Sequence, residues 1–528
     1  MCGLVVYTGN SSKLDDFQKH VQKIIHRGPD RLIMHNNGKG LIAFHRLRIM
    51  DLSNRGDQPF TDMTTDNMVV CNGEIYNSDQ LRKDVDYQFQ SESDCEVLLP
   101  LYSKLGLVKM ASTLDAEFAF VLWDASKKKF VAGRDPIGIR PLFYGYTIAE
   151  NKIMFSSEVK AIQHYCSIVK PFPPGHVYDG TKFISYLDIT KPTIVHNHSE
   201  ETVIQKIHEK LEKAIIKRLH SDAPVGFLLS GGLDSSIVCA VGQKYTDTPI
   251  KTFAVGMDKD PIDLKYAREV ADHIGSDHTE VIITKQDVLD SLLDVIWHLE
   301  SFDITTIRAS IGMFLICKSI TETSGIKVLL TGEVSDELFG YKYTDFAPSP
   351  EEFQLEAQKR IKELYLYDVL RADRCISAHA IEARVPFSDK DFVKYVMAID
   401  PQMKMNSSGY GKYLLRKAFD RENYLPHHIL WREKAAFSDA VGHSLVDTLK
   451  EKAEQMYSDR EFEFLKKKYS HATPISKESL MYREIFEELF PNKAELIPSF
   501  WMPNKNWQNC DVSDPSARVL PNYGDSGK

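Results

Sequence analysis

The chain has 528 residues, of which 43% are hydrophobic and 26% are charged, as is typical of a soluble globular protein with two or three domains. Its net charge of −9 excludes a general nucleic-acid-binding role, because contact with phosphate backbones requires a basic surface. No apolar run is long enough to cross a bilayer, and no charged segment precedes an apolar stretch at the start, so we expect neither a membrane protein nor a signal peptide.

The eight cysteines are scattered along the chain and form no C-x-x-C pair, which argues against a zinc ribbon or a redox motif. A long chain of this kind without a signal peptide is expected to keep its thiols reduced, and we therefore expect a cytosolic protein. Its expected partners are small molecules, with no nucleic acid and no membrane among them.

Residues 2–190 carry short apolar or alternating runs that are ended by turn-forming residues, a pattern that predicts β-strands. A helical stretch at 93–106 lies among them, and the runs themselves are 3–9 (GLVVYTG), 68–71 (MVVC), 118–123 (FAFVLW) and 129–133 (KFVAG). This pattern indicates an α+β domain with much antiparallel sheet.

A polar linker at 188–201 separates two regions with different patterns of predicted secondary structure. Ser199 within this linker is placed to cap the next helix. That helix carries its apolar residues on one face: Ile204, Ile207, Leu211 and Ile215. Strands, glycine-rich turns and helices then alternate over 200–490, which predicts an α/β domain with a largely parallel sheet. Residues 491–528 have no hydrophobic periodicity, and we expect a loosely held C-terminal tail.

The string LLSGGLDSS predicts an anion-binding loop. A buried strand at 225–229 leads into Ser230-Gly231-Gly232, and a helix begins at Ser235. Glycines let the backbone approach a ligand, and a helix N-terminus offers unpaired N–H groups to an anion. Asp234 is a candidate ligand for a Mg²⁺ that bridges phosphates. The loop lacks the G-x-x-x-x-G-K-[ST] pattern, and it resembles the pyrophosphate loop of enzymes that split ATP into AMP and pyrophosphate.

A second strand end carries acidic residues. The string LLTGEVSDELFGY places Glu333, Asp336 and Glu337 directly after a strand at 327–330, where ligands bind in open α/β sheets. These carboxylates suit Mg²⁺ or an ammonium ion, although a solvated acidic loop is the alternative. Arg308 lies in an apolar region and needs an anionic partner. For Lys434, surface ion pairs and a role at phosphate are equally supported by the sequence.

Cys2 is either a packing residue at the start of a strand or a nucleophile. If Met1 is removed, Cys2 gains a free α-amine with a reference pKa of about 7.7–8.0, which suits a general base. The string CNGEIYN places Asn72 and Gly73 as donors to an oxyanion. Glu74 and, farther along, Asp94 can accept hydrogen bonds from a substrate amine.

Ten strings spread over nearly the whole chain closely resemble those of glutamine-hydrolysing asparagine synthetases. They are MCG, HRLRIMD, CNGEIYN, RDPIGIRPLFYG, LLSGGLDSS, TTIRAS, GEVSDEL, YDVLRADR, EARVPF and DPSARVLP. The resemblance implies an N-terminal Ntn-hydrolase sandwich of αββα layers that acts as glutaminase, followed by an α/β ATP-pyrophosphatase domain with a parallel sheet. It further implies that Cys2 releases ammonia from glutamine, that ATP activates aspartate as β-aspartyl-AMP, and that ammonia reaches this intermediate through an internal tunnel. Mg²⁺ is the implied cofactor, and a homodimer is expected by analogy.

The resemblance also assigns site residues by matching motif positions. Catalytic roles fall on Cys2, Asn72, Gly73 and Glu333. Glutamine binding falls on Arg46, Leu47, Arg48, Ile49, Met50, Asn72, Gly73, Glu74 and Asp94. ATP binding falls on Leu229, Ser230, Gly231, Gly232, Asp234, Ser235, Val255, Thr331, Gly332 and Lys434. Aspartate binding falls on Thr305 and Arg308, and Mg²⁺ binding on Asp234 and Asp336.

The chain departs from the family pattern in its acidic loop. Val334 replaces the second glycine of G-E-G-S-D-E, and the segment after Glu337 is one residue short. Valine would strain the loop if this position adopts a positive φ. Two alternatives stay open from the sequence: a non-catalytic relative that senses nucleotide or glutamine, and an amidotransferase ligase that acts on another acid.

Overall fold

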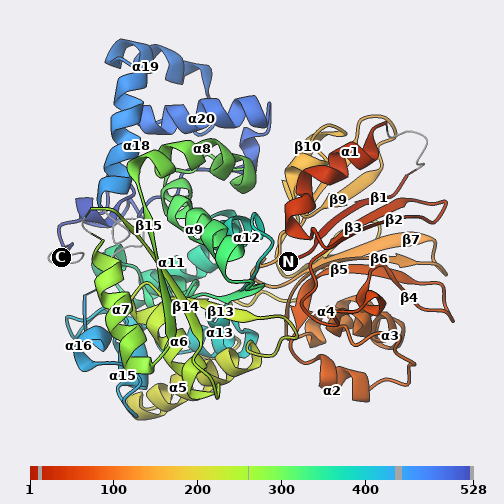
Figure 1. Ribbon diagram of the computed structural model, residues 1–528, viewed down its shortest axis with the longest axis horizontal. Coiled ribbons are helices and arrows are strands. Elements are labelled where there is room, and N and C mark those ends of the chain that lie inside the picture. Colours follow the sequence, from red (N-terminus) through yellow and green to blue (C-terminus); the bar gives the residue numbers. More distant parts are fainter. Residues whose placement is uncertain (10–14, 260, 434–442, 524–528) are drawn as a thin grey trace. The chain divides into compact units, whose positions relative to one another are not determined.

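The computed structural model describes residues 1–9, 15–259, 261–433 and 443–523 (Figure 1). The chain divides into two compact units. The first contains residues 1–189 with the short segments 221–224 and 377–382, and the second contains 190–220, 225–376 and 383–528.

The first unit contains two six-stranded sheets in which all described strand pairs are antiparallel. One sheet has the order β10 (Cys166–Pro171), β8 (Phe143–Thr147), β9 (Ile153–Ser156), β1 (Gly3–Tyr7), β3 (Leu41–Arg46) and β2 (Arg31–Asn36). The other has the order β12 (Phe183–Ser185), β11 (His176–Tyr178), β7 (Lys129–Arg134), β6 (Ala116–Asp124), β5 (Met68–Ile75) and β4 (Phe60–Thr61). The predicted antiparallel α+β domain is confirmed.

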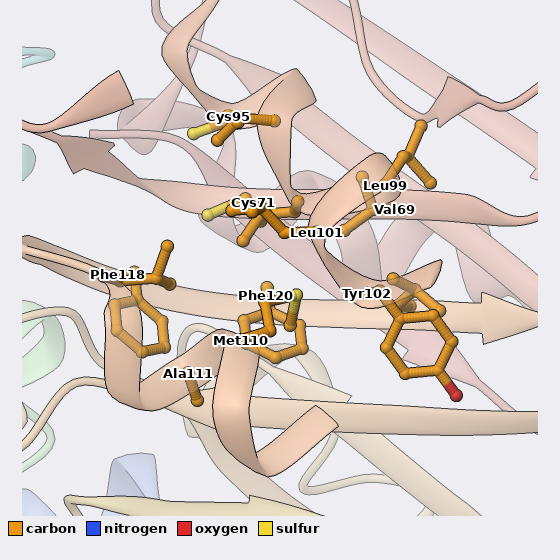
Figure 2. Close-up of a cluster of buried hydrophobic side chains, with 14 of the residues drawn as sticks. Val69, Cys71, Cys95, Leu99, Leu101, Tyr102, Met110, Ala111, Phe118 and Phe120 are labelled. Atoms are coloured by element: carbon orange, nitrogen blue, oxygen red, sulfur yellow. The ribbon is translucent and has the colours of Figure 1, made fainter. Parts of the chain in front are cut away.

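Alternation along β5 and β6 builds two cores from the same strands. Val70 and Val121 face the other sheet and pack with Leu4 of β1. Cys71 and Phe120 point to the opposite face, where they meet α3 (Leu98–Leu105) and α4 (Leu107–Thr113), as Figure 2 shows. On the outer side of the first sheet, α1 (Phe17–Val21) continues into the 3₁₀ helix η2 (Gln22–Arg27), which packs on β3. These contacts give the four layers of the expected sandwich.

The second unit is built around a five-stranded sheet with the order β15 (Asp277–Ile283), β14 (Lys251–Met257), β13 (Val225–Leu228), β16 (Val328–Leu330) and β17 (Glu382–Arg384). The pairs β13–β14, β13–β16 and β14–β15 are parallel, which confirms the predicted parallel sheet. The helices α6 (Leu233–Lys244), α7 (Ile262–Ile274) and α9 (Ile304–Thr323) pack directly on it, and α5 (Glu200–Lys217) packs on α6 (Figure 1).

Further helices of this unit are α8 (Lys285–Leu299), α10 (Ser335–Phe339), α11 (Pro350–Glu363), α12 (Asp368–Ser377), α13 (Lys390–Met397), α15 (Tyr413–Phe419), α18 (His443–Met456), α19 (Asp459–Leu465) and α20 (Lys477–Leu489). Ser199 caps α5 as predicted, since its side chain accepts a hydrogen bond from the N–H of Thr202.

Two sequence-based expectations require correction. Among the described residues, α9 is one helix that is long and apolar enough to span a membrane, and the expectation that no such run exists was wrong. Most of this helix is buried inside the second unit, as in the core helix of a globular domain.

The C-terminal tail is also not loosely held. Trp501, Trp507, Cys510 and Leu520 are buried in one cluster with Tyr343. Aromatic side chains bury large areas without any regular periodicity, and for this reason the sequence pattern did not indicate a packed segment.

Candidate active sites

Cys2 lies directly before β1, beside the segment that follows β3. The N–H of Leu47 points at its Sγ over 3.4 Å, and the Nε of Arg27 donates to its carbonyl oxygen over 3.0 Å. The side chain is partly buried against the core between the sheets. Burial raises the pKa of this thiol, and the nearby N-terminal amine and the Leu47 N–H oppose that rise.

Asn72 and Gly73 lie in the middle of β5, which packs against β1. Asn72 is 1% exposed, and within the described parts of the chain neither its amide nitrogen nor its amide oxygen has a hydrogen-bond partner. A Cβ at position 73 would lie 2.7 Å from the carbonyl oxygen of Glu117 on β6, so this position must be glycine. A buried amide without a partner costs stability, which is typical of a functional position.

The predicted glutamine-binding loop follows β3 and is held by Arg46. Its guanidinium donates to the carbonyl oxygen of Ser53 and to Oδ1 of Asp57, each over 2.6 Å, and also to the carbonyl oxygen of Asp51. Arg46 therefore supports the loop that carries Leu47, Arg48, Ile49 and Met50. Its predicted direct contact with glutamine stays a prediction.

Glu74 and Asp94 come together at the end of β5. Glu74 is buried, and Asp94 begins the 3₁₀ helix η4 (Asp94–Val97). The carboxylate of Asp94 accepts from the N–H of Ile75 over 2.7 Å, which fastens η4 to the residue next to Glu74. The predicted acceptors of a substrate amine thus lie close to the predicted oxyanion donors.

In the second unit, the predicted pyrophosphate loop joins β13 to α6. The strand ends one residue earlier than predicted, and the helix begins at Leu233 rather than at Ser235. Gly231 has a φ of +70°, and a Cβ there would lie 2.5 Å from the N of Ala267. The Oγ atoms of Ser230 and Ser235 are 3.0 Å apart, which closes the loop on itself. Gly232 is the N-cap of α6, and no side chain of the described residues caps this end of the helix, where unpaired N–H groups suit an anion.

The acidic loop after β16 lies against the pyrophosphate loop. A Cβ on Gly332 would lie 2.9 Å from the N of Ser235, and the hydroxyl of Ser335 donates to Oδ1 of Asp234 over 2.7 Å. The Nζ of Lys412 is 2.7 Å from Asp234 and 2.8 Å from Asp336. The two predicted Mg²⁺ ligands therefore converge on one cationic position.

Glu333 contacts a buried arginine. Arg371, on α12, donates to Oε2 of Glu333 over 2.6 Å and to Asp368 over 3.2 Å. Burial raises the pKa of Glu333, and the positive charge of Arg371 limits this rise.

The predicted aspartate contacts lie one turn apart on α9. The hydroxyl of Thr305 is buried and has no hydrogen-bond partner among the described residues. Arg308 is 3% exposed and contacts two carboxylates, those of Glu478 on α20 and of Asp514 in the C-terminal tail.

One cavity of about 320 Å³ unites these elements. Its lining contains every residue predicted to bind ATP, aspartate or Mg²⁺, apart from Gly231 and Lys434, and it also contains Glu333. Val255 of β14 and Thr331 lie in this lining, and the hydroxyl of Thr331 is buried without a partner among the residues that the structure describes. Lys434 lies outside the described residues.

Comparison with known proteins identifies the family of the chain. The family described as "Glutamine amidotransferase domain" matches residues 1–209, and the family described as "Asparagine synthase" matches residues 206–356 and 343–513. The glutamine-hydrolysing asparagine synthetase of Zea mays is 40% identical over 99% of this chain and 94% of its own length. That of Gallus gallus is also 40% identical, over 99% of each chain.

The chain belongs to the glutamine-hydrolysing asparagine synthetase family. A "probable" synthetase of the same name from Dictyostelium discoideum is 39% identical over 98% of both chains. These full-length relatives do not favour the two alternatives left open by the sequence, a non-catalytic sensing relative and a ligase for another acid.

The family resemblance did not identify several residues of the cavity. Lys412 and Arg371 line it and bind the predicted acidic residues, and Glu478 and Asp514 bind the predicted aspartate-binding arginine. A signal for Lys412 was present, since it follows the glycine-rich loop NSSGYG and precedes an amphipathic helix. Asp514 begins the string DPSARVLP, but this string does not reveal a pairing with Arg308, which is 206 positions away in the chain.

Proposed function

We propose that this chain makes asparagine in two reactions, with glutamine as the nitrogen donor and ATP as the activating substrate. The observation that carries the proposal is the cavity in which the pyrophosphate loop, Glu333 and the Thr305–Arg308 pair meet. A phosphate-binding loop next to a carboxylate-binding arginine is the arrangement that adenylation of an amino acid requires.

In the first reaction, the thiolate of Cys2 attacks the side-chain amide carbon of glutamine. The α-amine that Cys2 gains on loss of Met1 takes the thiol proton and then passes it to the departing ammonia. The amide of Asn72, which has no partner in the described part of the chain, and the N–H of Gly73 donate hydrogen bonds to the oxyanion. Water then cleaves the thioester to release glutamate and the free thiol.

In the second reaction, an oxygen of the aspartate β-carboxylate attacks the α-phosphorus of ATP, and pyrophosphate leaves. Arg308 and Thr305 hold the substrate, and the open N-terminus of α6 receives the pyrophosphate. Ammonia then attacks the β-acyl carbon, Glu333 accepts the proton released from nitrogen, and AMP leaves.

Asp234 and Asp336 fit the proposed Mg²⁺ site. Both carboxylates lie within 2.8 Å of the Nζ of Lys412, so they are close enough together to share one cation. Mg²⁺ in nucleotide sites is usually held by one or two carboxylates together with substrate phosphates. When bound, Mg²⁺ would supply positive charge that stabilises the departing pyrophosphate. The cytosol is the proposed compartment, which accords with eight free thiols, and the homodimer stays a prediction by analogy.

The decisive experiment replaces the nucleophile in a chain from which Met1 has been removed. We expect Cys2→Ala to abolish asparagine formation from glutamine and to preserve it from ammonium, as detected by asparagine and AMP release. Cys166→Ala is the matched control, because Cys166 is fully buried in β10 and should leave both activities intact. If glutamine-driven and ammonium-driven synthesis survive equally in Cys2→Ala, Cys2 is not the nucleophile. If the unaltered chain releases no AMP with either nitrogen source, the proposed synthesis of asparagine is wrong.

A further inference from the structure

The guanidinium of Arg308 is nearly saturated by protein carboxylates. Its Nε and Nη2 donate to Glu478 over 2.8 and 2.6 Å, and its Nη1 and Nη2 donate to Asp514 over 2.9 and 3.1 Å. A guanidinium has five N–H donors, and these two carboxylates use four of them. A third carboxylate can therefore bind Arg308 in a bidentate manner only if one of the present partners leaves.

Glu478 and Asp514 are not held equally firmly. Glu478 lies in the first turn of α20, is 3% exposed, and also accepts from the hydroxyl of Tyr482 over 2.8 Å. Asp514 is 19% exposed and lies in the tail, outside any helix or strand. Its carboxylate also accepts from the N–H of Ser516 over 2.8 Å and pairs with Lys450, which is 43% exposed. Asp514 is more exposed than Glu478, and its contact with exposed Lys450 contributes little, so of the two carboxylates Asp514 is the one that can leave more easily.

The tail segment also forms part of the cavity wall. Pro515, Ser516, Ala517 and Leu520 line the cavity together with Thr305 and Arg308. Leu520 is buried in the aromatic cluster with Trp501 and Trp507. This anchor holds the segment near the site even when the ion pair of Asp514 is broken.

The carboxylate of Asp514 has the same chemistry as the carboxylates of the substrate. With Arg308 and Lys450 as cations and Glu478 and Asp514 as anions, the cluster is neutral. If a substrate carboxylate replaced Asp514 on Arg308, the charge around the guanidinium would not change. If it were added as a third anion, the cluster would carry an uncompensated negative charge in a buried place, which is costly.

We propose that Asp514 is an internal competitor of aspartate for Arg308, and that this contact sets the affinity of the synthetase site for its amino-acid substrate. The inference rests on the proposed role of Arg308 in binding aspartate. A site that is blocked for part of the time binds its ligand more weakly, by the fraction of molecules in which it is open.

The test measures the KM for aspartate with ammonium as the nitrogen source, so that the glutaminase does not contribute. Asp514→Asn keeps the shape of the side chain and removes its charge. We expect the KM for aspartate to fall by about 3- to 10-fold, with the KM for ATP unchanged. Asp511→Asn is the matched control, because Asp511 lies in the same tail and is exposed, and its KM values should equal those of the unaltered chain.

The outcomes separate the inference from the proposed function. A KM for aspartate that is unchanged or raised in Asp514→Asn overturns the proposal that Asp514 competes with aspartate. If Asp514 only positioned Arg308, its loss would raise this KM. An unaltered chain that forms no AMP with aspartate, ATP, Mg²⁺ and ammonium defeats the proposed function instead.

A second measurement uses the unaltered chain and does not depend on how a variant folds. Saturating aspartate should release Asp514 and accelerate tryptic cleavage after Arg518, which lies four residues farther along the tail. A rate of cleavage that does not respond to aspartate contradicts the release of Asp514 from Arg308.

Discussion

At the scale of single residues, Asn72 combines a buried amide with the absence of any hydrogen-bond partner among the described residues. We predict that Asn72→Leu, which keeps the volume, lowers the kcat of glutamine hydrolysis by about 10²- to 10³-fold, because one oxyanion donor is lost. We further predict that the thermal midpoint stays equal or rises, since an unpaired buried polar group is removed. Glutamate release and differential scanning calorimetry measure the two effects.

Asn67 is the contrasting asparagine. It is also buried, but its Oδ1 accepts from the N–H of Ala125 over 2.9 Å. Asn67→Leu should therefore lower the stability by about 1–3 kcal/mol and leave the glutaminase of folded molecules active. If Asn72→Leu destabilises the fold as much as Asn67→Leu does and retains glutaminase activity, Asn72 is not an oxyanion donor.

Glu333 and Arg371 give a prediction on pH. Glu333 accepts a proton only when it is ionised, so ammonium-driven synthesis should decline as the pH falls through its pKa. Arg371 holds that pKa below the level that burial alone would give. Arg371→Gln should raise the pKa and move the acidic limb of the kcat profile to higher pH, whereas Arg371→Lys should keep it nearly in place. An acidic limb that is identical in both variants and in the unaltered chain would exclude Glu333 as the base.

The residue scale also separates what the sequence can predict from what it cannot. Asn72, Glu333 and Arg308 were identified because they stand in recognisable motifs. Lys412 and Asp514 were given no role, although Asp514 begins the string DPSARVLP, because their partners lie 178 and 206 positions away and only the folded chain brings these side chains together. The charged partners of motif residues are therefore the part of the site that only the structure reveals.

At the scale of elements, α10 begins with a strained residue. Val334 is its N-cap with a φ of 78°, in the left-handed region that disfavours β-branched side chains, and it is 2% exposed. The sequence expectation of strain at this position depended on a positive φ, which the structure has.

The strain can be measured with two truncations that lose nearly the same packing. Glycine is usually less stable than alanine by about 1 kcal/mol in a helical conformation. At position 334 this order should reverse, so we predict that Val334→Gly is more stable than Val334→Ala by about 1 kcal/mol. Urea denaturation of both variants compares their free energies of unfolding, and a less stable glycine variant would show that the loop carries no backbone strain.

Patterns within elements explain why the fold was largely predictable. Alternation in β5 and β6 and the cap at Ser199 are local signals, and the structure has both. The packed tail and the buried α9 were misjudged, because burial of an irregular aromatic segment or of an apolar helix depends on distant partners.

At the scale of the whole molecule, each unit contains its own proposed chemistry, and only the first depends on the start of the chain. Met1 is 1% exposed, its amine lies 3.7 Å from Glu382, and burial lowers the pKa of that amine to about 6. This amine belongs to Met1 and is separated from the thiol by a peptide bond, whereas the proposed base must belong to Cys2 itself.

We therefore predict that a chain with one residue fixed before Cys2 hydrolyses no glutamine and still makes asparagine from ammonium at the full rate. The matched control is the same chain cleaved so that Cys2 comes first, in which glutamine-driven synthesis should return. Glutamate and asparagine release, with intact mass to verify each N-terminus, measure the result. If the extended chain releases glutamate as fast as the cleaved one, the base is not the amine of Cys2 and must be sought among the side chains around it.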